Sequence, residues 1–337
     1  MADFSVVSHN IHGLNNSESY LRSLLERNDI VLIQEHWQFS RNFKRMSSLS
    51  PLHEMIATDG MKNRETEGLM LGRPYGGTAC FWSRKISPFV TPVLGISNPR
   101  LSALRIDYRD CSLILFNVYM PYLDVRNKTE SINDFIDVLS CIEMIHDDNS
   151  DCELIIAGDL NFQPGTGSPY ESLFAEFCST LGLLFCDNMF DNSGIDFTFF
   201  NEPRNVYRWL DHFCVSTTSL VSDISNLVIV NDATNLSDHL PIACNVHVSF
   251  PESSAMLNNS NNSHSRIMWE KCTDEHLNEY HKRLDHFLDN IIPPNVVSCT
   301  DVHCTNGQHQ RELEVLHGLT WAVFNQPTRF CQEVVQE

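Results

Sequence analysis

Short, almost continuous apolar runs alternate along the chain with longer segments in which apolar residues recur every three or four positions. The runs are rich in Val, Ile, Leu and Phe, which is typical of β-strands covered on both faces. They predict strands at residues 4–11, 29–35, 77–82, 101–108, 112–120, 153–160, 210–216 and 240–250. The longer segments have helical spacing and predict helices at residues 17–28, with Ser17 as N-cap, at 130–145 and at 168–183.

The order of these elements limits the fold class. Some strands follow one another directly, between residues 78 and 122, while others alternate with helices. This order predicts an α/β (α+β) fold, in which mixed sheets pack against each other with helices outside.

The pattern changes near residue 250, which predicts a domain boundary. We expect one domain over residues 1–250, a linker rich in Ser and Asn over 251–265, and a short helical appendage over 266–337. In the last segment one apolar stripe starts at Leu277 and a second at Leu313, which predicts a helical hairpin.

Charge changes the picture of possible partners. The formal net charge is −20, and residues 1–248 alone carry 17 Lys and Arg against 31 Asp and Glu. Binding of nucleic acid through an overall positive charge is therefore excluded, but binding through a local basic groove is not. Basic residues available for such a groove are Arg41, Lys44, Arg45, Arg126, Lys128, Arg204 and Arg208.

The N-terminus and the cysteines indicate the compartment. No apolar stretch approaches the ~20 residues of a membrane span. The N-terminus has no basic flank followed by an apolar core, so no secretion signal is expected. The twelve cysteines are scattered, and several lie inside predicted strands, as buried thiols in a reducing compartment do. We expect an intracellular protein, nuclear or cytoplasmic, with no membrane partner.

Polar residues interrupt the apolar runs near their ends. The run at 153–160 ends in Gly-Asp-Leu-Asn, where Gly158 permits a sharp turn or a close backbone approach. Asp159 and Asn161 are two residues apart, so an extended backbone would point both to one side. Other strand ends carry Asn10, Glu35, Tyr119, Asp211, and the pair Asp238 and His239. Together these residue types are the inventory of a metal-assisted hydrolytic site.

Each residue type suits one part of that chemistry. Glu35 is the best candidate ligand for Mg²⁺ or Mn²⁺, which prefer oxygen ligands. Asp159 is suited to act as the base that activates the attacking water, and the neighbouring Asn161 is suited to hold that water in place. His239, Asn10 and Tyr119 can donate hydrogen bonds to a phosphate, and Asp211 can orient His239.

In this order the motifs "SHNIHGL", "LIQEHW", "VYMPY", "AGDLNF", "LDHFCVS" and "SDHLPI" resemble the endonuclease/exonuclease/phosphatase family over residues 4–248. The resemblance implies a four-layer sandwich of two mixed sheets flanked by helices, a divalent metal and hydrolysis of a phosphoester. It implies that Glu35 binds the metal, that Asn10 and Asp238 lie near it, and that Asp159 activates water. The remaining implied roles are water positioning for Asn161, phosphate binding for Tyr119, and a hydrogen-bonded pair for Asp211 and His239. One departure from the family pattern is His12, because many nucleases of the family carry an acid at this position. A second is that Trp209-Leu210-Asp211 stands where the family has a Ser-Arg/Lys-Ile-Asp-like segment.

The segment "PYGGTACFWSRK" and the ending "TFF…LDHFCVS…SDHLPI" resemble the endonuclease domains of non-LTR (LINE-type) retrotransposons, which nick target DNA and leave a 3′-hydroxyl. The tail resembles the segment before the reverse transcriptase of such elements, so the resemblance implies DNA as partner and a reverse transcriptase in cis in the full-length element. This chain would then be a truncated copy or a stand-alone gene.

Two alternatives to the endonuclease stay open. The first is a phosphatase of the same fold that acts on a small molecule or an inositol lipid, which the acidic charge favours. The second is an inactive retrotransposon remnant. A separate candidate is a Zn²⁺ site at Cys299, Cys304 and His309, whose ligand types suit zinc but whose spacing matches no standard finger.

Overall fold

The computed structural model describes residues 2–61, 75–108, 111–190, 194–216 and 223–248. Contacts between residues divide the chain into two units at position 251, and the described residues all belong to the first unit. The predicted linker, the helical appendage and the candidate zinc ligands lie outside the described residues. In the described part, no helix is both long and apolar enough to cross a membrane.

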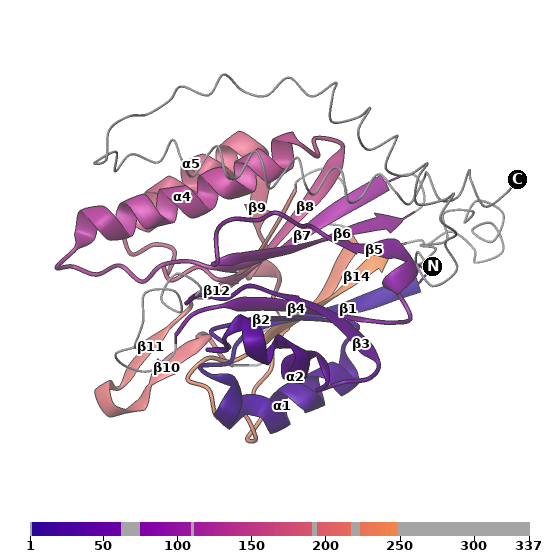
Figure 1. Ribbon diagram of the computed structural model, residues 1–337. Coiled ribbons are helices and arrows are strands. Elements are labelled where there is room, and N and C mark those ends of the chain that lie inside the picture. The colour runs from indigo at the N-terminus through magenta and orange to yellow at the C-terminus, as the bar shows by residue number, and fades with distance from the viewer. Residues whose placement is uncertain (1, 62–74, 109–110, 191–193, 217–222, 249–337) are drawn as a thin grey trace, which may run out of the picture. The chain divides into compact units, whose positions relative to one another are not determined.

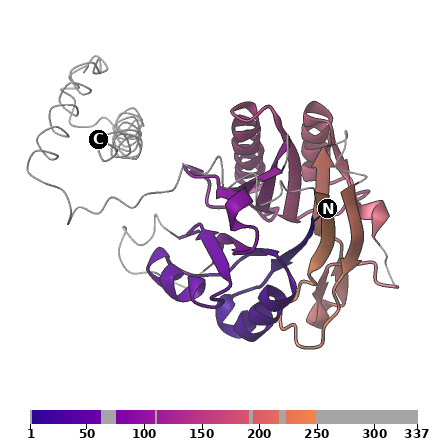
Figure 2. The same ribbon diagram turned by 90° about the vertical axis from the view of Figure 1, so that its right-hand side faces the viewer.

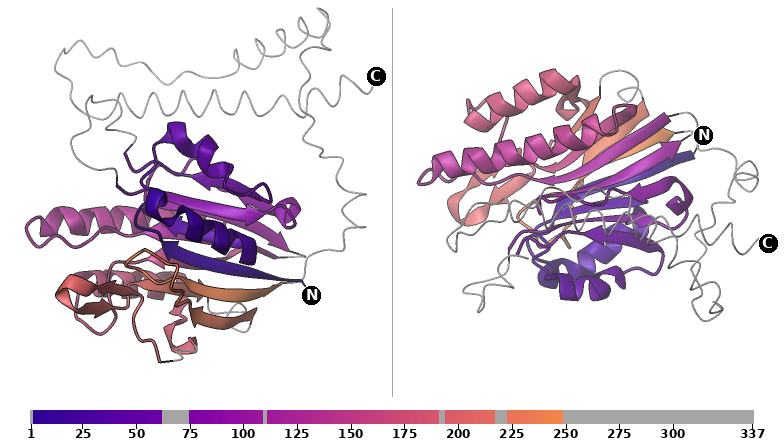
Figure 3. Two further views of the ribbon diagram at one scale, coloured as in Figure 1. Left: turned by 90° about the horizontal axis from the view of Figure 1, so that it is seen from below. Right: turned by 45° about the horizontal axis from the view of Figure 1, so that its top comes forward.

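Two mixed β-sheets lie face to face between helices, as expected from the sequence (Figure 1). In the described residues the first sheet has the order β13-β14-β1-β2-β4-β3 and the second β5-β6-β7-β8-β12-β9. Helices α1 (Leu14–Arg27) and α2 (Phe43–Ser47) cover the first sheet, while α4 (Lys128–Asp147) and α5 (Pro169–Leu181) cover the second. Figures 2 and 3 show the same four layers from other sides.

The strands of the first sheet are β1 (Ala2–Asn10), β2 (Ile30–Gln34), β3 (His53–Ala57), β4 (Thr78–Ser83), β13 (Ile224–Ile229) and β14 (Ile242–Val248). Those of the second are β5 (Val90–Pro92), β6 (Leu101–Tyr108), β7 (Cys111–Tyr119), β8 (Cys152–Asp159), β9 (Leu183–Phe185) and β12 (Asp211–Ser216). Strands β10 (Phe199–Asn201) and β11 (Val206–Arg208) form a hairpin that projects beyond the sheets in Figure 1. Short 3₁₀ helices span Ser40–Asn42, Ser87–Phe89, Asp187–Met189 and Glu202–Arg204.

All eight predicted strands and all three predicted helices are present. The pattern missed α2 and the strands β3, β5, β9, β10, β11 and β13, most of which are too short or too exposed to show a period. The prediction of Ser17 as N-cap is wrong, because the first helix starts at Leu14 and Gly13 is its N-cap. Ser17 lies inside the helix, where its hydroxyl donates a 2.7 Å hydrogen bond to the carbonyl of Ile11. The hydroxyl thus fastens the helix to the chain that leaves β1.

Apolar residues fill three layers between the sheets and helices. Along β1, Phe4 and Val6 belong to the core between the sheets, whereas Val7 faces the core under α1. On β7, Leu115 faces the other sheet and Phe116 faces α4 and α5. Because successive side chains of a strand point to opposite faces, strands covered on both sides are apolar at most positions.

Strand direction brings the polar strand ends together. Strands β1 and β2 are parallel and end side by side, with Asn10 opposite Gln34. Strands β7 and β8 are also parallel and end with Tyr119 opposite Asp159. Strand β12 runs antiparallel to β8, so its first residue, Asp211, also lies opposite Asp159. One end of the sandwich therefore collects side chains from five strands.

A buried polar link joins the two sheets just behind this end. The Gln34 side-chain amide donates to Asn117 of the other sheet at 2.7 Å and to Ser8 at 2.9 Å. The Asn117 amide in turn donates to the carbonyl oxygens of Ile33 and Ala79 at 3.0 and 2.9 Å. Paired buried amides of this kind permit one relative placement of the sheets, because any shift would leave polar groups unsatisfied.

We expect Gly158→Ala to destabilise the protein by more than about 1 kcal/mol. Gly158 has a φ of +147°, and an added Cβ would lie 1.9 Å from the carbonyl oxygen of Val118 on the neighbouring strand. The free energy of unfolding in urea measures the loss. Gly165→Ala is the matched control, because Gly165 also has a positive φ but has open space around its Cα. Equal losses for the two variants would contradict the steric explanation.

Candidate active site

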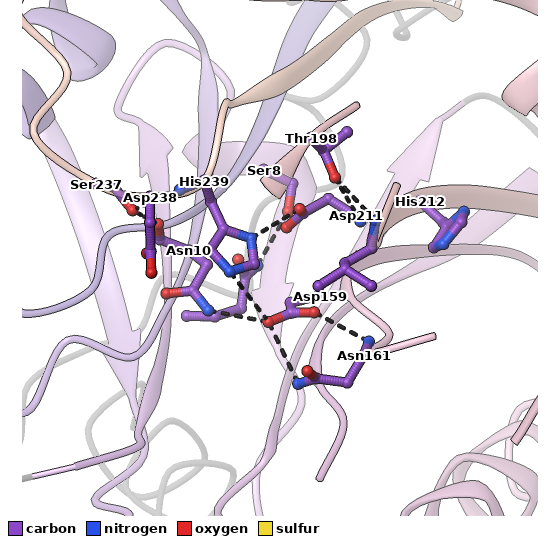
Figure 4. A network of polar contacts seen from close by, with 12 residues as sticks. Ser8, Asn10, Asp159, Asn161, Thr198, Asp211, His212, Ser237, Asp238 and His239 are labelled. Carbon is purple, nitrogen blue, oxygen red and sulfur yellow. Dashed lines mark hydrogen bonds and ion pairs between the residues drawn. The ribbon is translucent and has the colours of Figure 1, made fainter. Parts of the chain in front are cut away.

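The side-chain amide of Asn10, at the end of β1, connects the two sheets at the polar end (Figure 4). Its nitrogen donates to Glu35 Oε1 at 2.9 Å and to Asp159 Oδ2 at 3.0 Å. The two carboxylates accordingly lie within about 6 Å of each other, although they are far apart in the sequence. The structure thus places all three residues in one cluster, as expected from their strand-end positions.

Asp159 and Asn161 form a compact turn at the end of β8. The Asn161 backbone N–H donates to Asp159 Oδ1 at 3.0 Å, and its side-chain amide donates to Asp159 Oδ2 at 3.3 Å and to the Met120 carbonyl at 2.8 Å. The expectation of an extended backbone is wrong, because Asn161 has a φ of +54°. The left-handed turn nevertheless leaves both side chains on the same side of the strand end.

His239 lies between two carboxylates and completes the cluster (Figure 4). Its Nδ1 is 2.8 Å from Asp211 Oδ2, and its Nε2 is 3.8 Å from Asp159 Oδ2. All three side chains are almost wholly buried. The first contact is a hydrogen bond and the second is too long to be one, so Nε2 can donate to a bound group.

These close carboxylates shift the proton affinities in the site. Burial raises the pKa of Asp159 to about 7, and the neighbouring carboxylate of Asp211 adds to this effect. The positive charge of His239 acts in the opposite direction and lowers the pKa. Burial alone would lower the pKa of His239, but the carboxylates of Asp211 and Asp159 raise it to about 10. Near neutral pH His239 is therefore an imidazolium that can donate a proton or a hydrogen bond.

Tyr119 ends β7 beside this cluster. Burial, followed by the charges of Glu35 and Asp159, raises the pKa of Tyr119 far above its usual range, so the phenol stays a hydrogen-bond donor. The guanidinium of Arg100 lies over the Tyr119 ring, 5.1 Å from its centre. Among the described residues Arg100 has no carboxylate partner, which makes it a cation held at the edge of an acidic site.

Asp238 lies on the other side of His239 and contacts His12. The distance from His12 Nδ1 to Asp238 Oδ1 is 2.6 Å. Burial opposes ionisation of Asp238, but the hydrogen bond from His12 and the charge of His239 lower its pKa below the usual value. The residue that departs from the family pattern thus pairs with one of the expected metal-site residues.

The backbone around the cluster is unusual. Among the described residues six non-glycine residues have positive φ, and four of them surround this site: His12 (+45°), Glu35 (+54°), Trp37 (+56°) and Asn161 (+54°). Such conformations cost energy and persist where the surrounding structure imposes them, most often at functional sites.

The donor set fits a divalent cation. Glu35, Asp159, Asp211 and Asp238 supply carboxylate oxygens, the ligands that Mg²⁺ and Mn²⁺ prefer. Burial is the main cause of the raised pKa of Asp159, and the neighbouring carboxylates of Asp211 and Glu35 add to it; a cation would relieve their repulsion. Ligand atoms of Asp159, Asp211 and His239 lie within 4.8 Å of one another. The His239 ring lies between those two carboxylates.

Several residues of the site were given no role in the sequence analysis. Thr198 Oγ1 accepts hydrogen bonds from the backbone N–H groups of Leu210 and Asp211, at 2.9 and 3.0 Å. Ser237 Oγ donates to the Asn10 carbonyl at 2.6 Å and accepts the His239 backbone N–H at 3.1 Å. Ser237 and Thr198 belong to the "SDHLPI" and "TFF" segments, but neither residue was given a role there, whereas Arg100 lies outside every motif.

The family model of the endonuclease/exonuclease/phosphatase family matches residues 7–239, most of the described unit. The chain belongs to this family. The described fold of two mixed sheets between helices is the one that its structural neighbours share. No curated protein matches the sequence significantly.

Three solved structures of the fold are similar to this chain. An AP endonuclease from Leishmania major has a TM-score of 0.58 at 16% identity, over 73% of this chain and 88% of that one. The 3′ phosphatase NExo from Neisseria, bound to a product DNA hairpin, has 0.55 at 17%, over 72% and 98%. The endonuclease domain of TRAS1, a telomere-specific non-LTR retrotransposon, has 0.52 at 14%, over 73% and 99%. At these identities the likeness shows the shared fold.

We expect the imidazole of His239 to stay protonated through neutral pH and to titrate near pH 10. The raised pKa means that the ion pair with Asp211 stabilises the fold fully below pH ~6.5, the ordinary pKa of histidine, and that this stability is lost as the pH rises through about 10. Side-chain ¹⁵N NMR of the histidines measures the titration. In Asp211→Asn the midpoint should fall.

His36 is the internal control for this titration, because burial lowers its pKa to about 4 and it stays neutral over the same range. A midpoint for His239 near the ordinary histidine value would contradict the assignment.

Proposed function

We propose that this protein is a divalent-metal-dependent phosphodiesterase that nicks DNA, as the endonuclease of a non-LTR retrotransposon does. The observation that carries the proposal is the position of Asp159. Its carboxylate lies between the His239 imidazolium and the Asn10 amide, and Asn10 links it to Glu35. The proposed base Asp159, the cationic donor His239 and the proposed metal ligand Glu35 thus lie close together.

The roles of the residues follow from their contacts. Asp159 takes the proton from the attacking water, and the Asn161 amide, held by Met120, positions that water. His239, fixed by Asp211, donates from Nε2 to a phosphate oxygen, and the Tyr119 phenol is a second donor. A divalent cation on Glu35, with Asp238 and Asn10 nearby, would supply positive charge to the phosphate and the leaving oxygen.

DNA is the substrate that the combined observations favour. The motifs resemble those of non-LTR retrotransposon endonucleases, and the TRAS1 domain is one of the similar structures. Arg100 gives the acidic surface one cation at the rim of the site, where a backbone phosphate would approach. In this proposal residues 1–250 form the catalytic domain, the linker and tail lead to a reverse transcriptase in the full-length element, and the protein works inside the cell.

With Mg²⁺ or Mn²⁺ the protein should convert supercoiled plasmid to nicked circles that carry a 3′-hydroxyl. Asp159→Asn removes the base and His239→Ala the donor, so each should lower the rate by at least about a hundredfold. Gel analysis of the plasmid measures the rate, and extension by a DNA polymerase tests the 3′-hydroxyl.

Asp187→Asn is a matched control for this assay. Asp187 accepts a 2.9 Å hydrogen bond from another buried histidine, His212, whose other ring nitrogen contacts the Phe162 carbonyl. Its loss should change stability and leave the nicking rate unchanged. A soluble inositol phosphate tests the alternative: phosphate release with intact plasmid would place the protein among the phosphatases. No reaction with either substrate from a folded, metal-bound protein would indicate an inactive remnant.

Arg100→Ala should raise the KM for DNA about tenfold and lower the slope of log affinity against log salt by about one, because one phosphate contact is lost. The kcat should change less. Arg84→Ala is the control, since Arg84 follows the opposite end of β4 and pairs with Glu54 at 3.2 Å. An unchanged salt slope in Arg100→Ala would show that this cation does not contact DNA.

A further inference from the structure

Both oxygens of the Glu35 carboxylate accept a hydrogen bond inside the protein. Asn10 donates to Oε1 at 2.9 Å, and the indole Nε1–H of Trp37 donates to Oε2 at 3.0 Å. The Tyr119 phenol also interacts with this carboxylate. A carboxylate has about four lone-pair sites, so these contacts leave room for a cation. The two donors fix the rotation of the carboxylate, so the direction of those lone pairs is set before any metal binds.

The indole is itself held in place by the start of the first helix. Gly13 leaves the room that the ring fills, because a Cβ at this position would lie 2.5 Å from a ring carbon of Trp37. On another side the ring meets the imidazole of His12 edge to face, with 4.9 Å between centres. His12 in turn holds Asp238 at 2.6 Å. Trp37 thus contacts Glu35 directly and Asp238 through His12.

The turn that presents Trp37 is equally constrained. Glu35 and Trp37 both have left-handed backbones, with φ of +54° and +56°. The Trp37 backbone N–H donates to the Gly76 carbonyl at 3.0 Å, and the Glu35 carbonyl accepts the N–H of Gly13 at 2.8 Å. His36, between them, is fully buried and lies 2.9 Å from the Thr58 carbonyl through Nε2. A turn held at each residue supports a side chain with a fixed direction.

We propose that Trp37 is a positioning residue for the divalent-metal site, and that its indole N–H sets the orientation in which Glu35 binds the cation. The inference rests on the proposed role of Glu35 as metal ligand and adds the last residue of the "LIQEHW" motif, to which the resemblance assigns no role. Outer hydrogen-bond partners of metal ligands typically contribute 10–100-fold to metal affinity, because they orient the ligand in advance.

The test is Mn²⁺ binding by Trp37→Phe, followed through the EPR signal of free Mn²⁺. Phe keeps one aromatic ring in this turn but removes the N–H donor together with one ring of the indole, so a control for the loss of ring volume is needed. The Kd for Mn²⁺ should rise 10–100-fold. At saturating Mg²⁺ the kcat should return to within about threefold of wild type, because the ligand itself is still present.

Trp82→Phe is the matched control. Trp82 also donates one indole hydrogen bond, to Ser87 Oγ at 3.1 Å, but it lies at the far end of β4. Its loss should leave the Kd for Mn²⁺ within twofold of wild type. Glu35→Gln is the reference for loss of the ligand and should weaken binding at least as much as Trp37→Phe.

The outcomes separate this inference from the proposed function. Equal Mn²⁺ affinity of Trp37→Phe and wild type would overturn the role of Trp37 and leave the nuclease proposal intact. A low kcat of Trp37→Phe at every metal concentration would also overturn it, because that result indicates a collapsed site. Weaker Mn²⁺ binding by Trp37→Phe, in a protein that cuts no DNA, would support the positioning role while the proposed activity fails.

Discussion

The site depends on the two hydrogen bonds that the side-chain amide nitrogen of Asn10 donates. This nitrogen is one atom of the first sheet that donates to Glu35 in its own sheet and to Asp159 in the other. In the proposed mechanism a carboxylate ligand and a carboxylate base must lie close enough to share one phosphate, yet two like charges repel, and Asp159 is almost wholly buried. A donor between them provides both the short distance and partial neutralisation. The link between Gln34 and Asn117 behind it holds the sheets in the placement that this arrangement requires.

The second constraint is electrostatic. The carboxylates of Asp211 and Asp159 keep His239 charged, while burial, with Asp211 and Glu35 nearby, makes Asp159 a weaker acid than usual. These carboxylates also attract positive charge, which a divalent cation or a metal ion bound to the substrate would supply. The overall charge of −20 is therefore compatible with a phosphate substrate, because the positive charge is local and Arg100 adds to it at the rim.

Much of the fold and of the cluster could be predicted because both leave periodic or positional signals. Buried strands need apolar residues throughout, so polar residues at their ends, such as Asn10 and Asp159, stand out. Contacts made across the fold leave no such signal: Arg100 precedes a strand like any loop residue, and Thr198 acts through hydrogen bonds to a distant backbone. Ser17 shows the converse, since a residue type typical of N-caps is used here to fasten a helix from within.

The pairing of the first strand with the last has a consequence for synthesis. Strand β1 pairs with β14 from Ala2 opposite Val248 to Ser8 opposite Ile242, and the segment just before β14 carries Ser237 and His239. At 5–20 residues per second the ribosome releases these partners on the order of ten to fifty seconds apart. Asn10 and His239 cannot meet in that interval, because the chain between them is unfinished. The candidate site is therefore assembled only after the last strand of the first sheet has been synthesised.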